Sequence, residues 1–362
     1  MSSQLGLIKD EIVLKARAEV NDSIPPAWRL TPEQLRLPEG ASVIDMPRTC
    51  GLLTPKHMEI TEATATELLS KISIGELSSS EVTEAFCIRA AIAHQVTNCL
   101  TAFFPEEGLQ TAAALDKQFR TTGKTVGPLH GLPVCIKDMY DLKGRRSTMA
   151  YISWFDVVAS ADSALVAILR DAGAVFYSKT TMPQTGMMLE TRSPLWGVTT
   201  NPFNNQLVSG GSSGGDGVLV AMRGSPIAPS SDIGGSIRAP AAFNGLYSIR
   251  PSADRIPKGG LRSTAPGNVS IKVSSGPVCH NIVDLKMFTK IINAHGSLAH
   301  FEPGIVPIPW RELPPPVPKY SFGVWTFDGV CMPHPPILRA IKESTLRLTS
   351  QGHEGTRCLK IC

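Results

Sequence analysis

The sequence predicts an α/β fold in which a mostly parallel β-sheet is covered by helices. From Leu132 onward, short apolar runs bounded by glycine or aspartate alternate with helical segments. Such βα alternation is typical of a parallel sheet with helices packed on it. The chain has 362 residues, of which 42% are apolar and 18% are charged. This composition excludes a disordered chain and is sufficient for a sizeable core.

The segments before this alternation are predicted to be mainly helical. Residues 1–60 are polar and interrupted by prolines, so we expect an arm with one short helix that wraps on the main body. Two capping boxes, Thr64-Ala-Thr-Glu67 and Ser78-Ser-Ser-Glu81, predict the starts of two helices. A third helix is expected near residues 109–119, ending at a turn at Gly123.

The sheet region is expected to belong to one domain that spans residues 61–353. Leu132-Pro-Val-Cys-Ile136 has the pattern of a strand that is buried on both faces. A helix is predicted over residues 164–172, and the next strand over residues 174–177. Residues 301–319 contain seven prolines, which indicates a rigid connection at the surface.

Charge and cysteine usage exclude several classes of protein. The net charge of +4 is too small for a dedicated nucleic-acid or acidic-membrane binder, so we expect neither partner. No apolar run approaches the ~18 residues of a membrane span, and the N-terminus does not have the pattern of a signal peptide. A cytoplasmic location follows. The eight cysteines form no Cys-x-x-Cys pair and are expected to be buried free thiols, and we expect neither a metal nor a cofactor.

Two clusters of glycine and serine, at residues 210–217 and 234–236, are candidates for chemistry. A flexible loop is one alternative, and a phosphate cradle is a weaker one because the sequence contains no G-x-x-x-x-G-K-[ST] string. Nucleophilic catalysis is a third. Ser236 follows two glycines, whose unshielded N–H groups can converge on an oxyanion. Its base could be Lys137, because burial at a strand end would favour the neutral amine. Spacing alone favours a Lys137 that pairs with Asp138, and Ser236 could be a turn serine.

Three motifs resemble those of the amidase signature family. They are Gly131-Leu-Pro-Val-Cys-Ile-Lys-Asp138, Gly210-Gly-Ser-Ser-Gly-Gly215 and Asp232-Ile-Gly-Gly-Ser-Ile-Arg238, in the family's order and at matching spacings. The wider similarity is to fungal acetamidase-type general amidases and extends from the N-terminus to about His353. The resemblance implies a mixed, mostly parallel sheet with helices on both faces.

The resemblance also implies a role for each matching residue. Ser236 corresponds to the nucleophile that forms the acyl intermediate. Ser212 corresponds to a bridging serine held in a cis peptide, and Lys137 to the general base that acts through it. The remaining positions implied are the backbone N–H groups of an oxyanion hole at Ile233, Gly234, Gly235 and Ser236, a substrate contact at Gly186, and supporting side chains at Ser213, Asp232 and Arg238.

Three features of the sequence depart from the family's pattern. Asp216 stands where the family usually has glutamate. Ser230-Ser231 replaces Gly-Thr, which is expected to tighten the turn behind the oxyanion hole. Family members also usually continue further, so we expect the catalytic domain to be incomplete at its C-terminus, with residues 354–362 as an unmatched tail.

The leading functional hypothesis is an amidohydrolase that converts a monocarboxylic acid amide, a small-molecule substrate, into a carboxylate and ammonia through an acyl-serine. One alternative is an amidotransferase-type subunit of the same family, which the acetamidase-like N-terminus argues against. Another is a truncated, inactive fragment, since an incomplete sheet exposes strand edges. The preferred acyl group and the oligomeric state stay open, a homodimer being one option.

Overall fold

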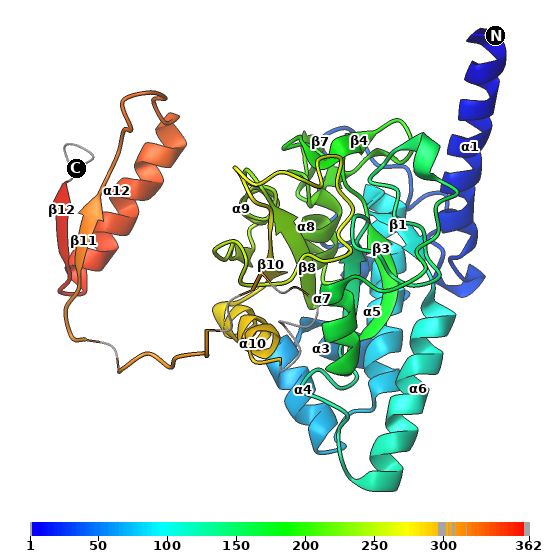
Figure 1. The fold of residues 1–362 in the computed structure, drawn as a ribbon, viewed down its shortest axis with the longest axis horizontal. Coiled ribbons are helices and arrows are strands. Elements are labelled where there is room, and N and C mark those ends of the chain that lie inside the picture. The colour runs from blue at the N-terminus through cyan, green and yellow to red at the C-terminus, as the bar shows by residue number, and fades with distance from the viewer. Residues whose placement is uncertain (1, 296–301, 303, 306–307, 316, 358–362) are drawn as a thin grey trace. The chain divides into compact units, whose positions relative to one another are not determined.

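The computed structural model describes residues 2–295, 302, 304–305, 308–315 and 317–357. The chain divides into two compact units, Met1–Trp310 and Arg311–Cys362, which we call the larger and the smaller unit. The ribbon is shown in Figure 1. All residues of the candidate site lie in the larger unit.

The first part of the larger unit is helical. Its helices are α1 Ser2–Asp22, α2 Met46–Thr49, α3 Pro55–Glu62, α4 Ala65–Ser73, α5 Ser79–Thr97 and α6 Pro105–Thr122. Both predicted capping boxes are present, at Thr64 and Ser78, and α6 ends at Gly123 as expected. The arm contains more helix than the single short one predicted, because α1 alone has 21 residues. Apolar side chains of the arm, such as Val20 and Ile24, are buried in the core against α5.

Two three-stranded sheets form the centre of the larger unit. One has the strand order β1-β3-β2 and the other β8-β10-β9. The strands are β1 Leu100–Phe103, β2 Pro133–Lys137, β3 Val175–Thr180, β8 Ile227–Asp232, β9 Tyr247–Ser248 and β10 Ser274–Cys279. The helices between and after them are α7 Ala164–Asp171, α8 Gly214–Ala221, α9 Arg238–Phe243 and α10 Ile282–Asn293. Two short hairpins precede α8, formed by β4 Arg192–Ser193 with β5 Gly197–Val198 and by β6 Thr200–Asn201 with β7 Asn204–Val208.

The mixed α/β fold class is confirmed, although its strand pairing is less parallel than predicted. The pair β2–β3 is parallel and is joined by the crossover through α7, as the βα alternation indicated. By contrast, β1 is antiparallel to β3, and β10 is antiparallel to both β8 and β9. The sequence alternation detected the crossover unit, but it carries no signal for strands that pair without an intervening helix.

Packing around the sheets brings the two Gly/Ser clusters together. Helix α8 contacts β2, β3, β8 and β10, while β2 also contacts β8. Helix α5 is buried along most of its length and packs against α8 and β2. The first turn of α8, the end of β2 and the end of β8 therefore meet inside the core.

The smaller unit consists of one helix and a two-stranded sheet. Strand β11 Ser321–Val324 pairs in parallel with β12 Glu354–Arg357, and α12 Pro335–Ser350 connects them. The first residues of the expected tail thus form a strand, and residues 358–362 lie outside the described residues.

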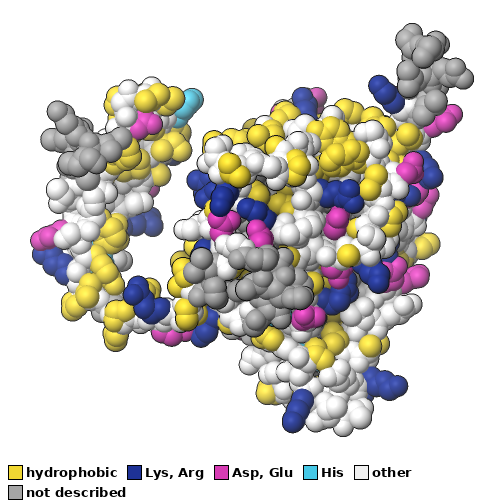
Figure 2. Space-filling view, viewed as in Figure 1, with side chains coloured by type: hydrophobic (Ala, Val, Ile, Leu, Met, Phe, Trp, Pro, Cys, Tyr) yellow, Lys and Arg dark blue, Asp and Glu magenta, His cyan; other side chains and the backbone are white. Residues whose placement is uncertain are grey.

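The described residues also show the distribution of surface charge, the state of the cysteines and the apolarity of the helices. On the face shown in Figure 2, acidic and basic side chains are interspersed over the larger unit. Of the six described cysteines, four are buried, Cys50 is half-buried and Cys331 is exposed, and all six are free thiols. Cys358 and Cys362 lie outside the described residues. No helix in the described part of the chain is long and apolar enough to cross a membrane.

Candidate active site

Lys137 is the last residue of β2, and its side chain is completely buried. Its Nζ lies 2.9 Å from Oγ of Ser212, 2.7 Å from Oγ of Ser213 and 2.9 Å from Oγ of Ser231. The alternative pairing with Asp138 is wrong, because the ion-pair partner of Asp138 is Lys179, at 3.8 Å. Lys137 instead points into a cluster of three hydroxyl groups.

Two of these hydroxyl groups come from the turn that opens α8. The peptide bond between Gly211 and Ser212 is cis, as the resemblance implies. The next turn of the helix packs against the end of β3, and a Cβ on Gly215 would lie 2.4 Å from the backbone nitrogen of Thr181. Only glycine allows this approach, so the glycines after Ser213 place the serine pair against the sheet.

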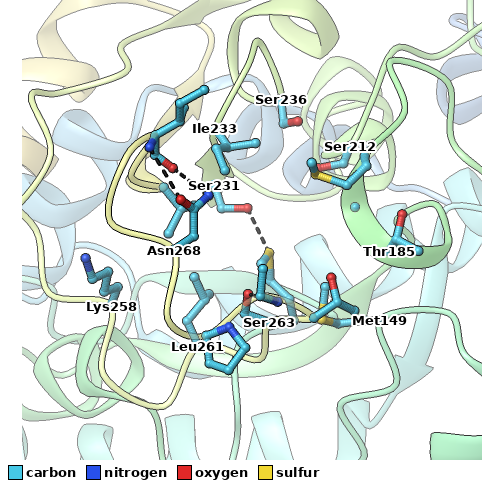
Figure 3. Close-up of a pocket in the computed structure, with 18 of the residues that line it drawn as sticks. Met149, Thr185, Ser212, Ser231, Ile233, Ser236, Lys258, Leu261, Ser263 and Asn268 are labelled. Atoms are coloured by element: carbon cyan, nitrogen blue, oxygen red, sulfur yellow. Dashed lines mark hydrogen bonds between the residues drawn. The ribbon is translucent and has the colours of Figure 1, made fainter.

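Ser236 lies in the loop between β8 and α9, and its side chain is 5% exposed. Its carbonyl oxygen accepts a hydrogen bond from the N–H of Ser213 at 3.2 Å, which ties the two Gly/Ser clusters together. In Figure 3, the Ser236 and Ser212 side chains lie beside each other on one wall of a cavity. The structure therefore brings Lys137, Ser212 and Ser236 to one place.

Asp232 holds the loop that carries Ser236. Its carboxylate accepts hydrogen bonds from Nε and Nη2 of Arg238, both at 3.0 Å, and from the N–H groups of Gly235 at 2.7 Å and Ile237 at 3.1 Å. Burial alone would raise the pKa of Asp232, but these hydrogen bonds, led by that of Arg238, lower it to about 2. Buried Asp232 and the more exposed Arg238 thus hold the loop in place.

The expected oxyanion hole of four N–H groups needs a correction. The N–H of Gly235 donates to Asp232 and is not available to a substrate. In the described part of the chain, the N–H groups of Ile233, Gly234 and Ser236 have no protein acceptor. A peptide N–H has one proton to donate, so three donors are left at the loop.

A cavity of about 380 Å³ opens beside Ser212 and Ser236. Its walls are largely apolar, and Met139, Met149, Ile233, Leu261 and Val273 contribute to them. Lys258 and Glu302 also line the cavity, and in Figure 3 Lys258 lies at the side away from the two serines.

Gly186 lines the same cavity, as expected for a residue that contacts substrate. Its φ is +70°, and a Cβ at this position would lie 3.0 Å from Cε of Met182 and 3.8 Å from Oγ of Ser212. There is therefore little room for a side chain between Gly186 and the serine.

Ser230 and Ser231 do not form the tight turn that was predicted. Both are strand residues of β8. The hydroxyl of Ser230 donates to Asp216 at 2.6 Å, and that of Ser231 donates to Sδ of Met139 at 2.8 Å while its oxygen faces Lys137. Ser231 is thus a third contact of the lysine that the motifs do not indicate. The replacement of Gly-Thr by Ser230-Ser231 was the one available signal.

Burial determines the protonation of the lysine. Removal from water lowers the pKa of Lys137 to about 8, although the charges of Asp216 and Asp232 act in the opposite direction. A neutral amine has two N–H donors and one lone pair, which matches three hydroxyl contacts. The protons of Ser231 and Ser213 have other acceptors, the Met139 sulfur and, at 3.4 Å, the Ser231 carbonyl. Among the described residues, Ser212 alone of the three has no acceptor apart from the lysine nitrogen.

Comparisons with known proteins identify the family to which the chain belongs. Residues 81–358 match the family described as Amidase. The chain belongs to the amidase signature family. The match includes the whole Lys137, Ser212 and Ser236 region and extends into the segment after residue 353 that was expected to fall outside it.

Two fungal relatives are longer than this chain, which aligns with only part of each. It is 51% identical over 343 residues to an amidase of Gibberella zeae, which covers 95% of this chain and 62% of the relative. It is 43% identical over 351 residues to an acetamidase of Aspergillus oryzae, covering 95% of this chain and 64% of the relative. The chain therefore spans less than two thirds of the length of these relatives.

Solved structures support the same fold. A fatty acid amide hydrolase has a TM-score of 0.91 with 37% identity, covering 96% of this chain and 62% of that one. A bacterial aryl acylamidase of the family has a TM-score of 0.71 with 24% identity, over 82% of this chain and 61% of that one.

Proposed function

We propose that the protein is a serine amidohydrolase that converts a carboxamide into a carboxylate and ammonia. The observation that carries this proposal is the 2.9 Å contact between the buried Nζ of Lys137 and Oγ of Ser212, beside Ser236 in one cavity. The names of the two fungal relatives, an amidase and an acetamidase, support the same reaction.

Acylation begins with proton transfer away from the nucleophile. Ser236 gives its proton to Oγ of Ser212, which passes its own proton to the lone pair of neutral Lys137. The electron pair on Oγ of Ser236 then forms a bond to the carbonyl carbon of the amide. Lys137 has no direct contact with Ser236 within the described residues, so the bridging hydroxyl is required.

The tetrahedral intermediate needs donors for its negative oxygen. The N–H groups of Ile233, Gly234 and Ser236 are the candidates, since each is unused by the protein. When the C–N bond breaks, the Lys137 ammonium returns its proton through Ser212 to the leaving nitrogen, and ammonia departs. Water then attacks the acyl-serine by the same proton route, releasing the carboxylic acid and restoring Ser236.

The lining of the cavity favours an uncharged acyl group next to the reacting carbon. Methionine and aliphatic side chains contribute much of the lining of the cavity that contains Ser236. A carboxylate placed there would lose its hydration without an arginine or lysine partner at that end. We therefore infer that the substrates are amides of monocarboxylic acids.

The proposal is tested by trapping Ser236 with a fluorophosphonate and measuring the intact mass. The wild-type chain is expected to gain one phosphonyl group, and Ser236→Ala none, while both melt at similar temperatures because the hydroxyl makes no hydrogen bond within the described residues. Undiminished labelling of Ser236→Ala would show that another residue is the nucleophile. A folded wild-type chain that is not labelled would favour the inactive-fragment alternative.

A further inference from the structure

Asp216 is a completely buried carboxylate for which the relay described above has no use. It is the third residue of α8 and lies three positions after Ser213. It has no ion-pair partner among the described residues, in contrast to Asp232, which is paired with Arg238. Burying a carboxylate without an ion-pair partner costs free energy of folding, and such groups cluster at functional sites.

Two hydroxyl groups that hydrogen-bond this carboxylate come from strands that support the lysine. Although burial raises the pKa of Asp216, a hydrogen bond from the side chain of Ser213, a contact of the lysine, acts to lower it. Oδ1 accepts the proton of Thr180, and Oδ2 accepts that of Ser230 at 2.6 Å. Thr180 is the residue of β3 that pairs with Lys137 of β2. Ser230 is the neighbour of Ser231, whose Oγ lies 2.9 Å from the lysine nitrogen.

We propose that Asp216 is a positioning residue for the general base. Its carboxylate joins α8, β3 and β8 around Lys137 and supplies the buried negative charge that balances the ammonium formed when Ser236 is deprotonated. This inference rests on the proposed function, because it assumes that Lys137 accepts the proton.

The other titratable groups near Lys137 and Asp216 do not supply the negative charge that would balance the ammonium. Cys99, Cys135 and Tyr140 face Asp216, and burial raises the pKa of each, so all three are uncharged near neutral pH. Apart from Asp216, the carboxylate that acts on Lys137 is Asp232, which is already neutralised by Arg238. Burial raises the pKa of Asp216 itself to about 6, so it is ionised in the range where the lysine loses its proton.

The experiment measures the rate of fluorophosphonate labelling of Ser236 between pH 6 and 10 in the full chain. In wild type, the rate should rise as Lys137 becomes neutral. Asp216→Asn removes the charge at nearly constant shape, so the rise should move to lower pH by about one unit and the maximal rate should fall about tenfold. Asp216→Glu keeps the charge and should leave the position of the rise unchanged, with a smaller loss of rate.

Asp284→Asn is the matched control. Asp284 is an equally buried carboxylate that accepts the N–H groups of Ala65 and Thr66, and it lines no part of the cavity beside Ser236. Its replacement should lower the melting temperature and leave the pH dependence of labelling unchanged.

The possible results separate this inference from the proposed function. If wild type is labelled and Asp216→Asn, although slower, rises at the same pH as wild type, Asp216 is merely structural and the inference is wrong. If wild type is not labelled, the proposed function fails and the inference fails with it. Should Asp216→Asn not fold, Ser230→Ala provides a second test: slower labelling at an unchanged pH supports the positioning role, and a wild-type rate refutes it.

Discussion

Lys137 is the residue on which the proposed chemistry depends, and its buried position at the end of β2 explains its lowered pKa. A lysine at the end of a buried strand cannot keep its water shell, and the serines around it replace that shell with only three oxygen atoms. The charged form is therefore disfavoured, which makes the amine a usable base near neutral pH.

The first prediction at this scale concerns pH. Below the lysine pKa of about 8 the ammonium has no lone pair, and above it the neutral amine can accept a proton. Amide hydrolysis should therefore rise with pH through about 8, and His130→Ala and His280→Ala should leave this rise in place. The measurement is ammonia release across the pH range in the three proteins. Loss of the rise in either histidine variant would contradict the role of Lys137.

A second prediction concerns the space beside Ser212. Gly186→Ala would place a methyl group 3.8 Å from Oγ of Ser212, where the substrate is expected to lie. Labelling of Ser236 should slow markedly. Gly123→Ala is the matched control, because Gly123 has a similar φ of +66° and nothing within 4 Å of its added Cβ. Gly123→Ala should lose about 1 kcal/mol of stability because of its positive φ, and Gly186→Ala somewhat more because its Cβ would also lie 3.0 Å from Cε of Met182. Equal labelling rates in the two variants would refute a substrate contact at Gly186.

Local signals predicted the secondary-structure elements well, whereas long-range contacts escaped them. Thr64 and Ser78 were identified as helix starts because a capping box lies within four residues. The N–H groups of Ser79 and Ser80 have a further acceptor in Asp116, 37 and 36 positions away on α6. No pattern in the sequence links these residues, since the contact is created by the packing of α5 on α6.

The contact between Asp116 and the first turn of α5 gives a prediction for the stability of that helix. Asp116 is 8% exposed and accepts the N–H groups of Ser79 at 2.6 Å and Ser80 at 3.0 Å. Asp116→Asn should lower the free energy of unfolding by about 2 kcal/mol, because an amide cannot accept both bonds with a full charge. Urea unfolding measures the loss. Glu81→Gln, in the exposed capping box of the same helix, should cost less than about 1 kcal/mol. A larger loss in Glu81→Gln would show that the local box dominates.

The motifs indicate which residues form the candidate site, but they do not indicate its geometry. Lys137, Ser212 and Ser236 lie on a strand end, a helix start and a loop, and only the packing of α8 between β2 and β8 brings them together. The same packing turns Ser231 toward the lysine and commits the N–H of Gly235 to Asp232. Spacing along a chain does not determine which of several adjacent donors faces a cavity.

At the scale of the whole molecule, a buried histidine should make stability depend on pH. Nδ1 of His94 accepts the N–H of Leu100 at 3.1 Å, and burial lowers the pKa of this histidine from 6.5 to about 4. Protonation would place two donors against each other inside the core. Because the folded-state pKa lies below the unfolded one, the contribution of His94 to stability should be fully present above pH 6.5 and fall by about 3 kcal/mol toward pH 4, in addition to that of His280, whose pKa burial also lowers to about 4.

Thermal melts of wild type and His94→Gln between pH 7 and 4 measure this effect. The variant should lose stability at pH 7 but show a shallower decline as the pH falls. His334→Gln replaces an exposed histidine of the smaller unit and should reproduce the wild-type decline. If His94→Gln declines as steeply as wild type, the buried imidazole is not the cause.

The most direct measurement of the central claim is ammonia release from acetamide and benzamide by the purified 362-residue chain, beside its Ser236→Ala and Lys137→Ala variants. We predict turnover in wild type, none in Ser236→Ala, and a loss on the order of 10⁴ or more in Lys137→Ala if the relay members act as a unit. Ammonia release by Ser236→Ala, a near wild-type rate in Lys137→Ala, or a folded wild-type chain that is labelled at Ser236 but turns over no amide would contradict the assignment of this site as a complete amidohydrolase.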